Sequence, residues 1–147
     1  MFRHILIPTD GSELSSRAVQ AGVQFARSLN ASVSGFYVEA DLPAPVYGEY
    51  GVMHLLTPEQ FRAREAEQAR NSLAVIEKAA KDAGVACETE SVISDNPWQA
   101  ITEAVKRKGC DLIFMASHGR RGIDALLLGS ETNKVLTYSS APVLVVR

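Results

Sequence analysis

The sequence predicts an α/β protein built on a five-stranded parallel sheet with helices on both faces. Short apolar runs bounded by turn residues alternate with longer segments in which apolar residues recur at helical spacing. The resulting order, β-α-β-α-β-α-β-α-β, is typical of parallel strands joined by right-handed crossovers. No internal repeat or second domain is visible, so we expect residues 1–147 to form one domain.

The first half of the chain carries clear boundary signals. Ser12 is a favourable N-cap, and Thr57, Pro58 and Gln60 form the pattern of a capping box with proline at the first helical position. We expect a strand at 4–8, a helix from Ser12 to Asn30, a strand at 33–38, an irregular loop at 40–57 and a helix from Thr57 to Gly84.

The second half contains three further strands. An alternating pattern marks a half-buried strand near a sheet edge, and Asp95-Asn96-Pro97 opens the helix after it. We expect a strand at 85–92, a helix from Asp95 to Gly109, a buried strand at 111–116, a helix from 129 to 138 and a final strand at 143–147. Trp98, in a first helical turn, is interpreted as a packing residue.

Composition and charge exclude several classes of protein. The chain is 46% apolar and 22% charged, close to an average globular protein, and its net charge of −2 argues against a nucleic-acid partner. The apolar run 143–146 is too short for a bilayer. Met1 to Ile7 lack the pattern of a secretory signal, and Cys87 and Cys110 form no CxxC pair. We therefore expect a cytoplasmic protein with reduced thiols and no membrane partner.

Candidate ligand-binding residues follow the ends of the strands. In an open parallel sheet, ligands bind beyond the carboxyl ends of the strands, here at 8–12, 38–40 and 117–119. Glycines at 119, 122 and 129 allow a close backbone approach, and a helix beginning near Ser130 offers free N–H groups to a phosphate. Glycines also simply make turns, so the residues alone leave both interpretations open.

Three segments resemble the universal stress protein family. The family signature is Gly-x2-Gly-x9-Gly-Ser/Thr. A similar pattern occurs here, where Met115-Ala116-Ser117-His118-Gly119 is followed by nine residues and then by Gly129-Ser130. The opening 5–12 and the closing 141–146 are also similar, so the resemblance spans essentially the whole chain. It implies a Rossmann-like sheet of order 3-2-1-4-5, a dimer, and bound ATP or AMP in many members. Ala116 replaces the first glycine of the signature, which is tolerable where the backbone φ is negative.

The resemblance also implies a nucleotide site. Asp10 would lie near the ribose and adenine, the backbone of Val38 at the adenine edge, and the signature residues along the ribose and phosphates. The candidate set is Pro8, Thr9, Asp10, Val38, Met115, Ala116, Ser117, His118, Gly119, Arg120, Gly122, Gly129, Ser130, Glu131 and Thr132. The implied ligand is ATP or AMP, with Mg²⁺ as a companion of ATP.

Simpler roles compete for several of these positions. Asp10 could hold the Gly11–Ser12 turn, and the hydroxyl of Ser130 could cap a helix. Arg120 and Arg121 could contact phosphates or lie solvated on a loop. His118 has no neighbouring nucleophile with an orienting carboxylate, so we expect no catalytic residue. The three histidines, at 4, 54 and 118, show no metal-ligand spacing, so we expect no metal site.

The preferred interpretation is an adenine-nucleotide-binding protein of stress response or signalling. A fast ATPase is disfavoured because the sequence has no Gly-x4-Gly-Lys-Ser/Thr loop, although a slow ATPase or nucleotidyl-transfer enzyme stays an alternative. The other alternative is a dimeric interaction protein with an empty pocket. We expect a homodimer through Val143, Leu144, Val145 and Val146, because an uncovered apolar strand at a sheet edge favours pairing with a second copy.

Overall fold

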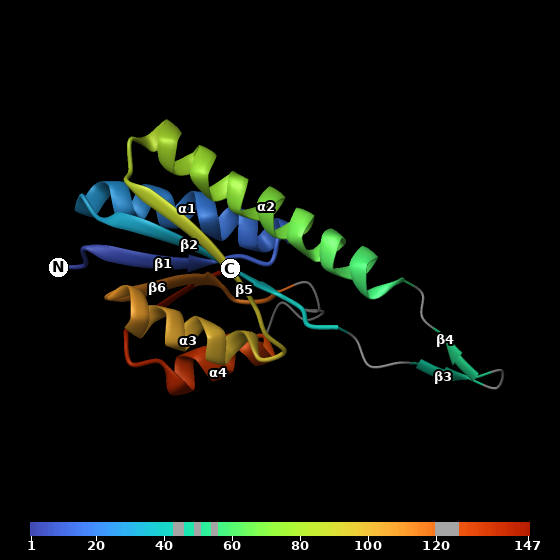
Figure 1. Cartoon of the computed structure of the whole chain (residues 1–147). Coiled ribbons are helices and arrows are strands. Elements are labelled where there is room, and N and C mark those ends of the chain that lie inside the picture. Colours follow the sequence, from blue (N-terminus) through green and yellow to red (C-terminus); the bar gives the residue numbers. More distant parts are fainter. Residues whose placement is uncertain (43–45, 49–50, 54–55, 120–126) are drawn as a thin grey trace.

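Five parallel strands form the central sheet of the computed structural model, which describes residues 1–42, 46–48, 51–53, 56–119 and 127–147 (Figure 1). The strands are β1 (His4–Pro8), β2 (Ser32–Glu39), β5 (Cys87–Ile93), β6 (Leu112–Ala116) and β7 (Val143–Val146). Their order across the sheet is β5-β2-β1-β6-β7, and every neighbouring pair is parallel. Numbered along the chain, the five strands have the order 3-2-1-4-5, which confirms the predicted fold.

Two pairs of helices cover the two faces of the sheet (Figure 1). The helices are α1 (Glu13–Leu29) and α2 (Pro58–Ala83) on one face and α3 (Pro97–Lys108) and α4 (Ser130–Tyr138) on the other. Ile5 and Ile7 of β1 pack under α1 and α2, whereas Leu6 packs toward α3 and α4. Because successive side chains of a strand point to opposite faces, the central strand β1 contributes to both halves of the core.

The ends of the helices follow most of the predicted signals. Ser12 caps α1 by accepting a hydrogen bond from the N–H of Ser15, and Thr57 and Gln60 form the reciprocal capping box of α2. Asn96 holds the N-cap position of α3, as expected, but its side chain makes no cap bond. Gly129 is the N-cap of α4, so the alternative role of Ser130 as a cap is not present.

The predicted irregular loop at 40–57 contains a short hairpin, which corrects that prediction. Strands β3 (Val46–Gly48) and β4 (Gly51–Met53) pair antiparallel, and Figure 1 shows them well away from the central sheet. The prediction gave most weight to the prolines and glycines of this segment. Val46, Tyr47 and Val52 are residue types that favour strands, and they outweigh those breakers over this short length.

Two further sequence expectations concern the cysteines and the apolar length of the helices. Cys87 and Cys110 are both free thiols, as predicted. Burial raises the pKa of the Cys110 thiol to about 11, so this side chain is protonated at neutral pH. In the part of the chain that the structure describes, no helix has the length and apolar character needed to span a bilayer.

Candidate functional site

A cleft of about 570 Å³ opens at the carboxyl ends of β1, β2 and β6. Twelve of the fifteen candidate residues line it: Pro8, Thr9, Asp10, Val38, Met115, Ala116, His118, Gly119, Gly129, Ser130, Glu131 and Thr132. Of the other three, Ser117 is buried and does not line the cleft, while Arg120 and Gly122 lie outside the described residues. The fold thus brings segments more than one hundred residues apart in sequence to one place.

The turn after β1 is held by its own side chains. Asp10 Oδ1 accepts a hydrogen bond of 2.9 Å from the N–H of Ser12. Thr9 Oγ1 accepts one of 3.2 Å from the N–H of Gly11 and lies 3.0 Å from Ser15 Oγ. The simpler role foreseen for Asp10, holding this turn, is therefore present in the structure. The turn fixes the position of the carboxylate at the edge of the cleft.

Two glycines allow the backbone to pass close to this turn and to its own strand. A Cβ atom on Gly119 would lie 2.6 Å from Asp10 Oδ2, closer than real Cβ contacts. A Cβ on Gly129 would lie 3.3 Å from Ser117 O and from His118 Cα, and the N–H of Gly129 donates to Ser117 O at 2.8 Å. Both positions therefore favour glycine because of close approach.

Ala116, which replaces the first signature glycine, fits its position. It is the last residue of β6 and is buried, and its carbonyl accepts a hydrogen bond of 3.1 Å from Thr132 Oγ1 of α4. Among the described non-glycine residues only Asn30 has a positive φ. Ala116 thus meets the condition of negative φ, and its methyl group introduces no backbone strain.

The first turns of α3 and α4 are tied together on the far side of the cleft. Glu131 Oε2 accepts a hydrogen bond of 2.9 Å from the N–H of Trp98. The rings of Trp98 and Tyr138 pack with their centroids 4.8 Å apart, so Trp98 has the predicted packing role. Glu131 and Thr132 therefore have structural partners in addition to their place in the cleft.

The charges that line the cleft are mainly negative. Among the described lining residues, Asp10, Glu65, Asp95 and Glu131 carry carboxylates and His118 carries an imidazole, whose Nδ1 lies 3.0 Å from Ser117 Oγ. The described residues contain no cluster of three or more side chains suited to a metal ion. This lining holds no preformed metal centre within the part that the structure describes.

Sequence reasoning missed the wall contributed by other elements. The additional lining residues are Ser15, Phe36, Tyr37, Glu65, Ser94, Asp95, Pro97 and Ile101, whereas Ala40, which also lines the cleft, belongs to the predicted segment 38–40. The residues that follow β5 could have been predicted from the implied strand order. In that order β5 lies next to β2, so its carboxyl end opens at the same edge of the sheet. Glu65 gave no local signal: it reaches the site because α2 lies beside the end of β2, where Glu65 Oε2 accepts the N–H of Ala40 at 2.9 Å.

Sequence comparison relates the chain to one family over its full length. The model of the universal stress protein family matches residues 1–147. Universal stress protein YxiE of Bacillus subtilis is 32% identical over 151 residues, with 100% of both chains covered. Universal stress protein MJ0531 of Methanocaldococcus jannaschii is 31% identical over 150 residues, which cover 100% of this chain and 83% of the relative.

Solved structures of similar proteins share the fold. A universal stress protein in complex with cAMP is 24% identical with a TM-score of 0.73, covering 99% of this chain and 97% of that one. A universal stress protein family member of Arabidopsis thaliana with AMP bound is 18% identical with a TM-score of 0.68, covering 98% and 90%. At these identities the likeness shows the arrangement of the sheet and helices.

Proposed function

This chain belongs to the universal stress protein family, and on that premise we propose that its cleft binds an adenine nucleotide in a stress-response or signalling role. The observation that carries the proposal is the pair of close approaches at Gly119 and Gly129, which border the cleft beside Asp10. A backbone free of side chains lets a ribose and its phosphate lie against the main chain. Two structural relatives hold cAMP and AMP.

The proposed pose follows from the elements around the cleft. The first turn of α4, at Ser130 and Glu131, offers N–H groups and the positive end of the helix dipole to the phosphate. The adenine would lie at the end of β2, where the backbone of Val38 can recognise its polar edge. The carboxylate of Asp10 would accept hydrogen bonds from the ribose hydroxyls.

The carboxylates that line the cleft affect how many phosphate groups a bound nucleotide can carry. Four carboxylates of the described lining would repel a triphosphate more strongly than a monophosphate. We therefore propose that AMP and cAMP bind without a metal and that ATP binds as its Mg²⁺ complex. Because the described residues supply no metal cluster, the ion would enter with the nucleotide.

Calorimetric titration tests the proposal. AMP and cAMP should bind with dissociation constants on the order of micromolar, and CMP should bind much more weakly because the cleft would recognise adenine. ATP should bind more tightly with Mg²⁺ than with EDTA. Absence of heat and of any thermal shift with AMP, cAMP and Mg²⁺-ATP at millimolar concentration would overturn it.

A second proposal concerns assembly, and the exposure of β7 favours it. This strand lies at the edge of the sheet, and each of its residues, Val143, Leu144, Val145 and Val146, is only half-buried. An apolar strand with one unpaired edge favours pairing with its own copy about a two-fold axis. We propose a homodimer through β7. The alternative function is a dimeric interaction protein with an empty cleft, and the calorimetric titration with nucleotides would reveal it.

A further inference from the structure

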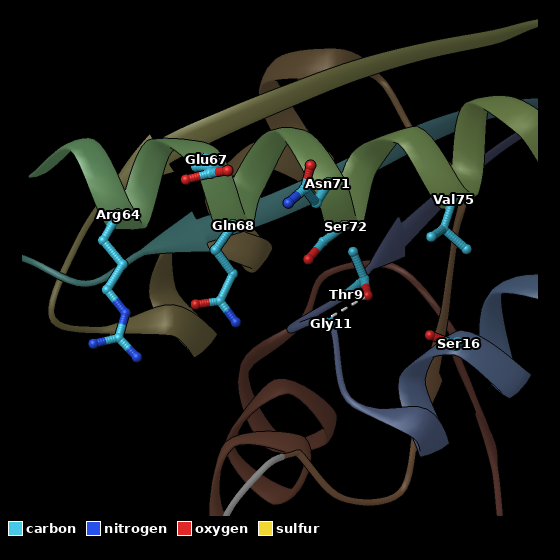
Figure 2. Close-up of a pocket in the computed structure, with 9 residues that line it drawn as sticks. All are labelled: Thr9, Gly11, Ser16, Arg64, Glu67, Gln68, Asn71, Ser72 and Val75. Carbon is cyan, nitrogen blue, oxygen red and sulfur yellow. Dashed lines mark hydrogen bonds between the residues drawn. The ribbon is translucent and has the colours of Figure 1, made fainter.

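A second pocket, of about 440 Å³, lies between α2 and the turn after β1 (Figure 2). We call it the α2 pocket. Among the residues that the structure describes, Thr9 alone lines both this pocket and the cleft described above. The α2 pocket is therefore a separate space, and the inference drawn from it does not depend on nucleotide binding.

One wall of the α2 pocket is a stripe of polar side chains on α2. Arg64, Gln68 and Ser72 are spaced by four residues, so they lie on one face of the helix. Figure 2 shows all three projecting from the same side of α2, the side on which the turn at Thr9 and Gly11 and Ser16 of α1 lie. A guanidinium, an amide and a hydroxyl thus face the same space.

The hydroxyl of Ser72 is the observation that points to a ligand. Ser72 is only 8% exposed, and it makes no hydrogen bond with any residue in the described part of the chain. Its oxygen points into the pocket in Figure 2. Among the described residues no side-chain nitrogen or oxygen atom is both fully buried and without a partner, so this hydroxyl reaches the solvent of the pocket and is accessible to a molecule that enters it.

Arg64 supplies the charge that selects the ligand. Among the described residues of the lining it is the one cationic side chain, and it forms no ion pair with the carboxylates that the structure describes. Glu67, the acidic residue of the lining, lies along the side of α2 in Figure 2 rather than beside the guanidinium. Guanidinium groups bind carboxylate and phosphate oxygens in pairs, so an oxyanion is the group that this end of the pocket suits.

We propose that the α2 pocket binds a small hydroxylated organic anion. Its carboxylate or phosphate pairs with Arg64, and its hydroxyl groups exchange hydrogen bonds with Gln68 and Ser72. The volume lies in the range of pockets that hold small molecules, and the polar lining suits a sugar acid or a sugar phosphate rather than an apolar compound.

A matched set of three six-carbon ligands tests the chemistry. D-gluconate carries a carboxylate, D-glucose 6-phosphate carries a phosphate, and D-glucose carries neither. Each is titrated into ¹⁵N-labelled full-length protein while amide shifts are followed. One or both anions should give saturable shifts at 9–16 and 64–75, and which of them binds identifies the oxyanion. Glucose should give none at about 10 mM, a concentration that still detects weak binding.

Two variants and one matched control connect the binding to the proposed residues. Arg64→Ala should weaken the anion about 10-fold or more, since a charged hydrogen-bonded pair is lost. Arg70→Ala removes an equal charge from α2 outside the pocket and should leave the affinity unchanged. Ser72→Ala should weaken binding without lowering the melting temperature, because the free protein offers its hydroxyl no partner among the described residues.

Three results of the titrations would overturn the proposal, and one result with the variants would contradict the role of Arg64. The first is no saturable shift with either anion, and the second is equal binding of glucose. The third is a set of shifts confined to the other cleft, at 115–119 and 130–132, which would assign the anion to that site. An Arg64→Ala variant that binds as well as Arg70→Ala would contradict the assigned role of the guanidinium.

Discussion

Asp10 uses its two carboxylate oxygens differently. Oδ1 accepts the N–H of Ser12 and holds the turn, whereas Oδ2 faces the backbone of Gly119. Adding a side chain at position 119 would therefore push on the carboxylate that we place against the ribose. The glycine and the acid act as a pair, although 109 positions separate them in the sequence.

Gly119→Ala tests this pair. The new methyl group should displace the tip of Asp10, and the loss of a hydrogen bond to a charged group, about 1.5–3 kcal/mol, should weaken AMP roughly 10-fold or more. The melting temperature should change little, because the end of a side chain moves more easily than backbone. Calorimetric titration and thermal unfolding measure the two effects.

Gly109→Ala is the control, because it should lower stability without changing AMP affinity. Gly109 has φ +67° and no atom near its missing Cβ, so alanine there should cost about 1 kcal/mol of stability through backbone strain and leave AMP affinity unchanged. A Gly119→Ala protein that loses stability but keeps its affinity would refute the proposed pairing with Asp10.

Lys108 joins two carboxylates of β5 to the end of α3. Its Nζ lies 2.9 Å from Glu88 Oε1 and 3.1 Å from Glu90 Oε2. The hydrogen bonds from Lys108 and then from Ser34 lower the pKa of Glu88 below its usual value. A carboxyl whose pKa is lower when folded stabilises the protein above its unfolded pKa and loses that stabilisation as pH falls through the folded value.

The free energy of unfolding should therefore decline as pH falls below about 4.3, the usual pKa of a glutamate. Lys108→Met should make this decline shallower, since the cation that holds Glu88 ionised is gone. The effect should be small because Glu88 is largely exposed. Lys106→Met removes an exposed lysine of α3 that forms no ion pair in the part of the chain that the structure describes, and it is the control. Equal slopes for the two variants in urea unfolding between pH 3 and 7 would disprove the role of Lys108.

At the scale of elements, α2 and α4 begin in different ways. Thr57 and Gln60 satisfy two backbone donors at the start of α2, but Gly129 caps α4 without a side chain. Thr57→Ala should therefore cost about 1 kcal/mol of stability and leave nucleotide binding intact.

Ser130→Ala should show the reverse. Ser130 makes no cap bond, so its loss should change stability by less than about 0.5 kcal/mol, as for an ordinary surface position. Its affinity for AMP should fall while its affinity for adenosine stays the same, if the hydroxyl meets the phosphate. Equal losses for both ligands in parallel titrations would show that Ser130 has no phosphate role.

The same elements show what sequence could and could not predict. The spacing of apolar residues and the capping residues predicted α1, α2 and the central strands. These patterns are local, because burial and backbone hydrogen bonding act on neighbouring residues there. The β3–β4 hairpin was missed because glycines and prolines mask two short strands. At the site, motif residues of β1, β6 and α4 were predicted together, but Glu65 was not, since its place depends on how α2 packs.

At the scale of the whole molecule, the two edges of the sheet differ. β7 is apolar throughout, whereas β5 alternates and carries Glu88, Glu90 and the exposed Ile93. Charges on an edge strand discourage pairing, so we place the proposed dimer at β7.

Val145→Lys should produce monomers, because it puts a charge into the proposed interface. Ile93→Lys, which adds the same charge at the opposite edge, should stay dimeric. Light scattering at micromolar concentration distinguishes these masses, and circular dichroism confirms that each variant is folded. A wild-type protein that runs as a monomer would rule out the dimer without any variant.

The central claim is that an adenine nucleotide occupies the cleft at the strand ends. The most direct measurement is an amide shift map of the ¹⁵N-labelled protein titrated with AMP. We predict saturable shifts at Asp10, Val38, Gly119 and Ser130, with none at the outer residues of α2 such as Arg70. A titration with no saturable shift, or with shifts only outside the cleft, would contradict the account.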